Sequence, residues 1–474
     1  MKRIAIIGGG ISGLAAAFAL EQKRKAGAPL DYVLYESSPR FGGVLVTETV
    51  GGCQIEAGPD SFLTEKPWAS DLCRQIGLEN QLIGSNDPDR ITYILVNGRL
   101  IPIPDGLMFM VPTKIVPAVL SPLFSFSTKL RMAMEWFHPP RKADADESVA
   151  SMVTRHYGPE MVDRLADPLL SGVYGGDASQ LSVRAVLPRF AEMEAKHGSL
   201  GRAMLAARSK MRSSSGGSRP LFTSLLGGMQ QMVDALLARL QSHSLRSNAA
   251  VQRLENQGNA WKVLSENSWQ SFDAVIMATP AQAAAEVLKA ANAPLASELR
   301  GIEYTSSITI NLGYDARVRS SLPPGFGFLV PRSENRRMLA ATFVHNKFPH
   351  RAPPDCALLR CFVGGAGNAS VFDCPDDHIV AAIRAELKEI LGITIDPLFA
   401  CVYRWSGAMA QYVVGHLERL QRIENLLAQL PGLMLAGNGY RGIGVPDCIR
   451  SGTDAATKAL AVLGLSEAKI PANA

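Results

Sequence analysis

The chain has 474 residues, of which 47% are hydrophobic and 19% charged, and its formal net charge at pH 7 is +5. This length exceeds what one hydrophobic core usually serves, so we expect two or three globular domains. The mild positive excess shows no dominant basic cluster, which argues against nucleic-acid binding. The seven cysteines are odd in number and lack C-x-x-C spacing, which indicates reduced cytoplasmic thiols and neither a disulfide framework nor a metal site.

The strongest signal lies in the first thirteen residues. Lys2 to Ile7 is a short run of mostly branched apolar residues, typical of a buried parallel strand. Because this first apolar run is itself the expected dinucleotide-binding strand, we expect no secretory signal. It ends in Gly8-Gly9-Gly10-Ile11-Ser12-Gly13, a G-x-G-x-x-G sequence, and an alanine-rich helix follows. In this pattern the first glycine permits a tight turn, the second admits a pyrophosphate and the third lets helix and strand pack closely. We therefore expect a dinucleotide at the N-terminus of this helix.

The next strand and the residues after it support the prediction of a bound dinucleotide and indicate which dinucleotide it is. Tyr32 to Tyr35 ends at Glu36, about twenty residues beyond the last glycine, where a ribose hydroxyl needs an acceptor. The alternative is a glycine-rich turn that binds nothing, with Glu36 solvated. Ser37 to Gly43 then supplies an arginine and a Gly-Gly turn, and Glu56 to Asp60 follows. This run resembles the E-x-x-x-R-x-G-G fingerprint of the flavin amine oxidase superfamily, and the resemblance implies FAD instead of NAD.

A second glycine-rich turn lies near the C-terminal end. A strand from Leu433 runs into Gly437 to Gly444, and a helix is expected to start near Pro446, since proline suits the first helical turn. The N-terminus of that helix would face the edge of the flavin where reduction places negative charge. The alternative is a plain strand-loop-helix unit.

Pattern changes along the chain predict an α/β fold with a Rossmann-like FAD-binding domain, an inserted α+β substrate domain and a helical subdomain that faces a membrane. Asn97-Gly98 between two apolar runs predicts a hairpin, alternation at Ser307 to Leu312 predicts an antiparallel sheet, and the Ser/Gly-rich residues 212–219 predict a boundary loop. The expected ranges are 1–88, 212–280 and 405–474 for the FAD-binding domain, 89–104 and 281–404 for the substrate domain, and 105–211 for the membrane-associated subdomain.

The stretch from Gly106 to Phe137 is dense in apolar residues and interrupted by three prolines. The prolines argue against a continuous membrane span. The apolar density around Phe109 and Phe124, with basic side chains nearby, predicts a segment that rests on the cytoplasmic face of a membrane. The alternative is that these side chains form the core of a helical subdomain.

Together these pieces resemble the porphyrinogen oxidases of haem synthesis, the protoporphyrinogen and coproporphyrinogen oxidase group. The most specific match is Gly437 to Gly452, supported by Pro168 to Asp177 and Gly325 to Pro331. The resemblance implies oxidation of protoporphyrinogen IX to protoporphyrin IX in three two-electron steps, with hydride passing to flavin N5 and dioxygen yielding hydrogen peroxide. The alternatives are oxidation of coproporphyrinogen III to coproporphyrin III, another oxidase of this fold acting on amines or carotenoids, and a flavin-binding tetrapyrrole carrier. A homodimer and handover of product to a ferrochelatase stay open.

The resemblance also assigns site residues. FAD contacts fall on Gly8, Gly9, Gly10, Ile11, Ser12, Gly13, Glu36, Ser37, Gly43, Val44, Gly58, Pro59, Asp60, Ser61, Val251, Trp405, Ile443, Gly444 and Val445. Substrate contacts fall on Phe326, Gly327, Leu329 and Phe362, which would form an apolar slot for a flat tetrapyrrole. Val251 is otherwise an ordinary strand valine, and the aromatic residues are otherwise core. No catalytic base and no metal ligand is assigned, and lone histidines such as His345, His350 and His416 are expected to be structural.

One position departs from the family. Mitochondrial and plant relatives carry an arginine just before the first arm of the hairpin, where it pairs with a propionate. Aligned on Asn97-Gly98, that position is Thr92 here, and the nearest arginine is Arg90. A two-residue shift keeps the same strand face, so Arg90 is a substitute candidate beside Thr92. The choice between a substrate with two carboxylates and one with four depends on this anchor.

Overall fold

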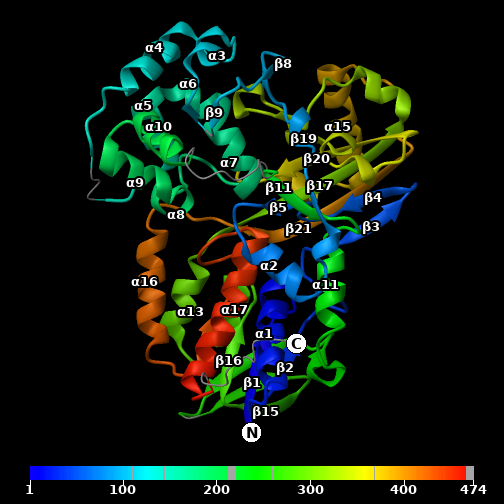
Figure 1. Cartoon of the computed structure of the whole chain (residues 1–474). Coiled ribbons are helices and arrows are strands. Elements are labelled where there is room, and N and C mark those ends of the chain that lie inside the picture. The colour runs from blue at the N-terminus through cyan, green and yellow to red at the C-terminus, as the bar shows by residue number, and fades with distance from the viewer. Residues whose placement is uncertain (109, 142–144, 212–219, 259, 368, 466–474) are drawn as a thin grey trace.

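The structure is a computed structural model, and it describes residues 1–108, 110–141, 145–211, 220–258, 260–367 and 369–465. The chain forms three lobes (Figure 1). A lower lobe carries the N-terminal end of the chain, a helical lobe lies at the upper left, and a large sheet with α15 (Asp376–Leu391) lies at the upper right. The expected boundary loop 212–219 and Phe109 fall outside the described residues.

The lower lobe is built on a parallel sheet of five strands in the order β12-β2-β1-β16-β22. Its strands are β1 (Lys2–Ile7), β2 (Leu30–Tyr35), β12 (Leu245–Arg246), β16 (Ala274–Met277) and β22 (Leu433–Leu435). This is the sheet expected of a dinucleotide-binding domain, and the predicted strand-turn-helix unit at the start of the chain is confirmed by β1 and α1 (Ile11–Lys25).

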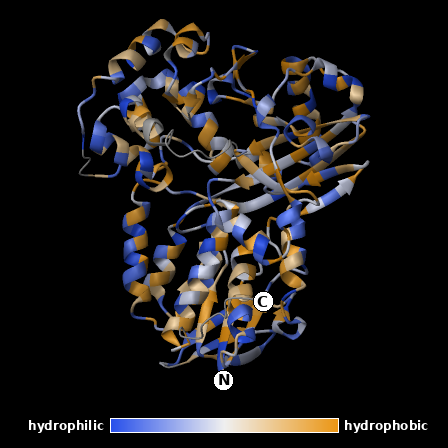
Figure 2. Cartoon of the chain, viewed as in Figure 1, coloured by the Kyte–Doolittle hydropathy of each residue, from blue (hydrophilic) through white to orange (hydrophobic). Residues whose placement is uncertain are grey.

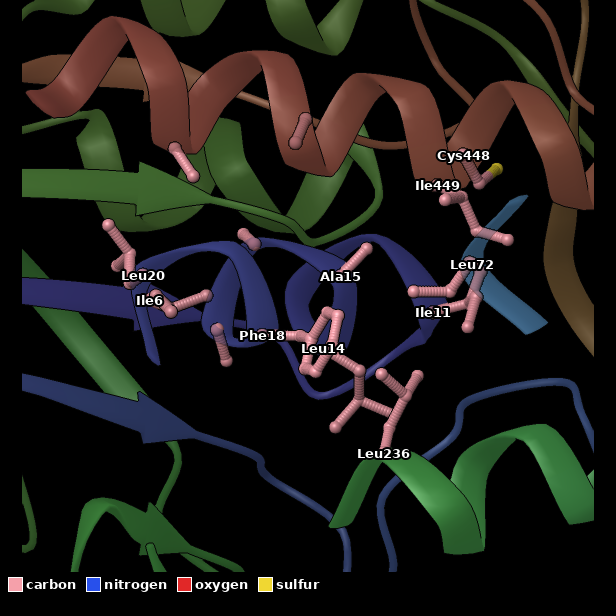
Figure 3. Close-up of a cluster of buried hydrophobic side chains, with 14 of the residues drawn as sticks. Ile6, Ile11, Leu14, Ala15, Phe18, Leu20, Leu72, Leu236, Cys448 and Ile449 are labelled. Carbon is pink, nitrogen blue, oxygen red and sulfur yellow. The ribbon is translucent and has the colours of Figure 1, made fainter. Parts of the chain in front are cut away.

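One face of this sheet is covered by α1, α11 (Gln230–Leu237) and α17 (Val445–Val462) (Figure 3). Leu14 and Phe18 of α1 belong to the same buried cluster as Leu236 of α11 and Ile449 of α17. α1 and α17 approach closely because Gly452 lacks a side chain: a Cβ there would lie 2.0 Å from the backbone oxygen of Ser12. Ile11 at the start of α1 and Cys448 near the start of α17 lie on the same side in Figure 3, so the N-terminal ends of both helices are on one side of the lobe.

The opposite face of the parallel sheet carries a second core. It is covered by a three-stranded antiparallel sheet of β13 (Val251–Asn256), β14 (Trp261–Ser265) and β15 (Ser268–Phe272), and by α12 (Ala281–Leu288), α13 (Ala293–Arg300) and α16 (His416–Leu427). From the sequence we expected the residues of α12 and α13 in the substrate domain, but their apolar side chains pack in this core of the lower lobe.

The upper right lobe is a sheet of seven strands in the order β21-β17-β20-β19-β18-β7-β8. Its strands are β7 (Thr92–Val96), β8 (Arg99–Pro102), β17 (Tyr304–Asp315), β18 (Gly327–Leu329), β19 (Met338–Phe343), β20 (Cys356–Gly364) and β21 (Phe399–Ala410). The predicted hairpin at Asn97-Gly98 is confirmed by β7 and β8. The sheet is antiparallel as expected except between β7 and β18, which pair in parallel. α15 covers one face, with Ile383 and Leu387 buried against the sheet.

Smaller elements complete the structure. They are the hairpin of β3 (Thr47–Val50) and β4 (Cys53–Glu56), the sheet of β5 (Phe62–Leu63), β11 (Phe222–Leu225) and β6 (Leu82–Gly84), and helices α2 (Trp68–Gln75) and α14 (Val344–Lys347). α2 packs in the same core as α1 and α17.

The helical lobe follows β8 in the chain. Its elements are β9 (Leu107–Met108), β10 (Val111–Pro112), α3 (Ile115–Leu120), α4 (Phe126–Glu135), α5 (Val149–Tyr157), α6 (Pro159–Met161), α7 (Asp167–Tyr174), α8 (Val183–Val186), α9 (Pro188–His197) and α10 (Leu200–Met211). Phe124 is buried in the core of this lobe, so the expectation that it faces a membrane is wrong, because it packs with Tyr157 and Leu165 instead. Within the described ranges, no helix combines the length and the apolar character needed to cross a bilayer.

Candidate functional site

The glycine loop between β1 and α1 shows which glycines the fold itself requires. A Cβ at Gly13 would lie 1.9 Å from the backbone oxygen of Gly8, so close packing excludes any side chain there. A Cβ at Gly10 would meet no heavy atom of the described residues within 4 Å, and the φ of Gly10 is −69°, which any residue can adopt. Gly10 is also the N-cap of α1 and supplies no side-chain cap. The end of α1 therefore has backbone N–H groups without a side-chain cap, and packing alone does not require a glycine at position 10. Both features suit the binding of a pyrophosphate.

Glu36 lies at the end of β2, directly beside this loop. Its carboxylate accepts hydrogen bonds from the backbone N–H of Gly9 at 2.7 Å and of Ser38 at 2.8 Å. β13, which begins at Val251, lies nearby because the N–H of Ala249 donates to the backbone oxygen of Glu36 at 2.9 Å. The structure therefore groups Glu36 and the start of β13 beside the glycine loop, and the adenine contact of Val251 stays a prediction.

The arginine of the fingerprint has a structural role. The guanidinium of Arg40 donates to the backbone oxygens of Gly43 and Leu45, each at 2.5 Å, and so holds the Gly-Gly turn. That turn lies against the first glycine loop, since a Cβ at Gly43 would lie 3.2 Å from the Cα of Gly10. The predicted contacts Ser37, Gly43 and Val44 are thus held near the helix end.

The predicted FAD segment from Gly58 to Ser61, with Ala57 just before it, is fixed by side chains of the upper right lobe. Trp405 Nε1 donates to the oxygen of Ala57 at 2.8 Å, and Arg360 donates to the oxygen of Gly58. Lys347 Nζ lies 2.9 Å from Asp60 Oδ2, and Arg351 donates to the backbone oxygen of Asp60 at 2.9 Å. The segment expected to line the flavin is therefore tied to β20, β21 and α14.

These contacts belong to a buried charge cluster, defined as Glu56, Asp60, Lys347, Arg351 and Arg360. Burial alone would raise the pKa of Asp60, but the charges of Lys347, Arg360 and Arg351 hold it well below its usual range. Burial lowers the pKa of Lys347 and of Arg360, and burial raises the pKa of Glu56. The cluster holds one more cation than carboxylates, which gives this side of the site a positive field.

The three cations of the cluster, Lys347, Arg351 and Arg360, were not predicted as site residues from the sequence. A signal was present, because Arg360 interrupts the apolar run Leu358 to Val363 of a strand that reads as buried. A charged residue in such a run is seldom buried unless it is paired.

The C-terminal turn presents a second uncapped helix end. Gly444 is the N-cap of α17 with no side-chain cap, which confirms the predicted helix start near Pro446. Tyr412 fixes the turn, because its hydroxyl donates to the oxygen of Asn438 at 2.7 Å and accepts from the N–H of Gly442 at 2.8 Å. Ile443, Gly444 and Val445 thus lie at the N-terminal end of α17, where the helix dipole is positive, and their contact with the flavin stays a prediction.

The predicted substrate residues fall largely on one surface. Leu329 pairs with Ala340, which pairs with Phe362, so Leu329 and Phe362 share one face of the large sheet. This face is opposite to the one that packs on α15 through Phe328. Leu329 and Ile443 both pack against the core of the helical lobe, so the three lobes meet here. Phe362 also lies 4.8 Å from the guanidinium carbon of Arg360, measured to its ring centroid.

Other predicted substrate residues differ in exposure or in backbone setting. Phe326 is only 7% exposed and precedes β18, and Gly327 must lack a side chain because a Cβ would lie 1.9 Å from the oxygen of Ala341. Thr92 opens β7 and pairs with Gly327. Arg90 lies outside β7, at the end of a short 3₁₀ turn, and pairs with Asp87 at 3.3 Å. The same-face argument for Arg90 is therefore wrong, because Arg90 is not part of the strand, and its role as an anchor stays a prediction.

The histidines near the site are engaged by the backbone. His345 Nδ1 lies 3.1 Å from the oxygen and 3.2 Å from the nitrogen of Leu358, and burial lowers the pKa of His345 to about 4. His416 Nε2 lies 3.0 Å from the oxygen of Tyr440, and burial lowers its pKa as well. These contacts give both side chains structural roles.

Comparison with known proteins assigns the class. The sequence profile of the flavin-containing amine oxidoreductases matches residues 11–460, and the chain belongs to this family. The chain is thus a flavin-dependent oxidoreductase, as the fingerprint predicted. Cyclohexylamine oxidase from Brevibacterium oxydans IH-35A shares the fold, with a TM-score of 0.69 at 19% identity over 98% of this chain and 99% of that one.

Closer relatives narrow the comparison. The chain is 36% identical over 471 residues to coproporphyrinogen III oxidase of Bacillus subtilis, covering 98% of each chain. It is 29% identical over 498 residues to mitochondrial protoporphyrinogen oxidase of Nicotiana tabacum, covering 98% of this chain and 95% of that one. A crystal structure from Exiguobacterium sp. 255-15, provisionally named a protoporphyrinogen oxidase, matches with a TM-score of 0.86 at 31% identity, covering 98% and 99% of the two chains. The predicted resemblance to this group is confirmed.

Proposed function

We propose that the protein is an FAD-dependent oxidase that converts coproporphyrinogen III to coproporphyrin III with dioxygen as acceptor. The observation that carries the proposal is end-to-end similarity to proteins named coproporphyrinogen III oxidase, at 36% identity in Bacillus subtilis and 29% in Staphylococcus aureus. From the sequence we expected protoporphyrinogen IX as the substrate and coproporphyrinogen III as the alternative, and these relatives favour the alternative. Protoporphyrinogen IX stays the second candidate because of the plant relative.

The residues at the junction of the lobes fit FAD. The uncapped end of α1 and the bare backbone at Gly10 would bind the pyrophosphate, and Glu36 would accept a ribose hydroxyl. The uncapped end of α17 and the segment from Ala57 to Ser61 would orient the ring. FAD bound there would take hydride equivalents from the substrate and pass them to dioxygen.

The protein's main contribution to the reaction is placement. Leu329 and Phe362 would hold one side of the macrocycle on the face of the large sheet opposite α15, and the meeting of three lobes would exclude water. Formation of the aromatic porphyrin drives the oxidation. No general base is assigned, since His345 and His416 are held by backbone groups.

The substrate assignment is tested by offering both porphyrinogens to the purified holoprotein in air and following porphyrin fluorescence. We expect kcat/KM to be at least ~10-fold higher for coproporphyrinogen III, a difference of about 1.4 kcal/mol in transition-state binding. A preference for protoporphyrinogen IX would move the assignment to the second candidate. If neither substrate yields a porphyrin, the remaining candidate functions are an amine or carotenoid oxidase and a tetrapyrrole carrier.

We further propose that the outer surface of α3 and α4 rests on an anionic membrane. Exposed apolar side chains line both helices, and Leu120 is 76% exposed and Phe126 and Phe137 each 81%. The exposed positions are Val116, Val119, Leu120, Phe126, Leu130, Met134 and Phe137. On α4 the spacing of 126, 130 and 134 makes one stripe, and Phe137 follows just beyond the end of the helix. Lys129 and Arg131 lie on the same helix, where they suit anionic headgroups. Figure 2 shows these helices at the outer rim of the molecule.

A further inference from the structure

Two buried thiols from distant parts of the chain meet at the junction of the lower lobe and the large sheet. Cys53 opens β4 and Cys356 opens β20. Their Sγ atoms are 3.1 Å apart although the residues are 303 positions apart in sequence. A disulfide bond is about 2.05 Å long, so closure needs the two sulfurs to approach by only about 1 Å.

The surroundings of the pair leave it free for thiol chemistry. Cys53 is 0% and Cys356 3% exposed, in an apolar cluster with Ile55 and Leu358. The charged groups that face the pair are Arg319, which donates to the backbone oxygen of Cys356 at 3.0 Å, and Asp355. Across the described part of the chain, no set of three or more His, Cys, Asp or Glu side chains could hold a metal. The two thiols therefore have each other as their nearest polar side-chain partners.

We propose that Cys53 and Cys356 form an intramolecular disulfide site that hydrogen peroxide closes. One sulfur, as its thiolate, attacks a peroxide oxygen, the O–O bond breaks, and hydroxide leaves a sulfenic acid behind. The second sulfur then attacks the first, the S–O bond breaks and water departs. Both sulfurs are oxidised, the peroxide is reduced to two waters, and the thiol protons end in that water. Hydrogen peroxide is also the product expected of the proposed oxidase. Disulfide formation does not depend on that activity, because hydrogen peroxide from any source would serve as the oxidant.

The bond would join two segments that shape the candidate site. β4 leads directly into the segment from Ala57 to Ser61, and β20 carries Arg360 and Phe362. A crosslink at the start of both strands would fix the predicted flavin segment against the predicted substrate wall. It would also close a loop of about three hundred residues, which constrains the unfolded chain strongly.

Burial makes the closure selective. It raises the pKa of Cys53 to about 12, so thiolate is scarce and bulky thiol reagents have no access. A small oxidant, or a brief opening of the β3–β4 hairpin at the edge of the molecule (Figure 1), is needed for reaction.

Peptide mapping of the holoprotein tests the site. Reduced protein is treated with hydrogen peroxide in the absence of any porphyrinogen, alkylated under denaturing conditions without reductant, digested and analysed by mass spectrometry. We expect the Cys53 and Cys356 peptides to be linked and two hydrogens lighter than their sum, with the link reversed by dithiothreitol. The thermal midpoint should rise by about 3–8 °C on oxidation.

Matched variants sharpen the result. Cys53→Ser and Cys356→Ser should each lose the linked peptide and the rise in thermal midpoint. Cys401→Ser, which changes a third cysteine beside the same apolar cluster, should keep both. The proposal is overturned if wild-type protein treated with peroxide still alkylates at both Cys53 and Cys356, or if either becomes a sulfinic acid without forming the link. The wild-type map decides even if a serine variant fails to fold, and it does not depend on which substrate the enzyme oxidises.

Discussion

Gly10 has no packing reason of its own to be glycine, and this separates ligand binding from folding. A Cβ at Gly10 meets nothing within 4 Å among the described residues, whereas one at Gly13 collides with the oxygen of Gly8 at 1.9 Å. We predict that Gly10→Val keeps its thermal midpoint as apoprotein but binds FAD at least ~100-fold more weakly, about 2.7 kcal/mol, because the branched side chain takes the pyrophosphate position. Titration of apoprotein with FAD measures this. Gly13→Ala, the matched control, should lower the thermal midpoint of the apoprotein. Unchanged FAD affinity in Gly10→Val would refute the placement.

Asp60 should make the protein sensitive to acid. Its pKa is depressed in the folded state by Lys347, Arg360 and Arg351. A depressed carboxyl pKa contributes stability above the unfolded value of about 3.9, and this contribution is lost as the pH falls toward the folded value. Asp60→Asn should destabilise the protein by about 3–5 kcal/mol at neutral pH, since it leaves buried cations short of a partner.

The pH dependence is read from thermal midpoints. The gap between wild type and Asp60→Asn should be widest above pH ~4 and shrink below it. Asp71→Asn is the control, because Asp71 forms a surface pair with Arg74 and both side chains are about half exposed. A gap that does not change with pH would show that Asp60 does not carry the charge.

Phe362 tests the substrate wall more cleanly than Phe326. Phe326 is 7% exposed, so its removal would leave a cavity. Phe362 is only partly buried, on the face of the sheet opposite α15. We predict that Phe362→Ala lowers kcat/KM for the porphyrinogen by about 5–150-fold, equivalent to ~1–3 kcal/mol, with a smaller effect on the thermal midpoint. Phe328 lies on the opposite face, against α15. Phe328→Leu should therefore lower the thermal midpoint and have the smaller effect on kcat/KM. Equal kinetics in wild type and Phe362→Ala would place the substrate elsewhere.

At the scale of elements, α3 and α4 decide whether the protein meets a membrane. We predict that wild type floats with anionic vesicles and is released by high salt, and that Phe126→Glu with Phe137→Glu abolishes flotation without unfolding, because both side chains are 81% exposed. Leu398→Glu, which changes a 66% exposed side chain of the sheet lobe, should still float. Wild type that never floats would leave the exposed stripe without a membrane role.

Elements with local signals were predictable from the sequence. The turn at Gly8 to Gly13 and the hairpin at Asn97-Gly98 depend on glycine conformations and short-range alternation. Arg90 shows where local reasoning fails, because Asp87 to Asp89 form a 3₁₀ turn that takes it out of the strand. Phe124 fails similarly, since an apolar residue in a short helical lobe looks the same whether it faces core or solvent.

Contacts between distant segments were not predictable. The pairing of Asp60 with Lys347 joins residues 287 positions apart, and no pattern in either neighbourhood specifies its partner. The sequence also does not show which lobe α12 and α13 pack against, because their apolar faces would suit either one. In the structure they pack on the parallel sheet of the lower lobe.

At the scale of the whole molecule, the candidate site exists only where the lobes meet. The lower lobe supplies two uncapped helix ends, the large sheet supplies Leu329 and Phe362, and the helical lobe packs against Leu329 and Ile443. This arrangement separates the cofactor side of the site from the substrate side. It places the expected reaction between them.

The most direct test is to mix the holoprotein with coproporphyrinogen III in the absence of air. We predict that the yellow flavin absorption is lost, and that admitting air restores it while coproporphyrin fluorescence appears. A flavin that stays oxidised with coproporphyrinogen III and with protoporphyrinogen IX would contradict the account, and would mark the protein as a tetrapyrrole carrier or an oxidase of another substrate.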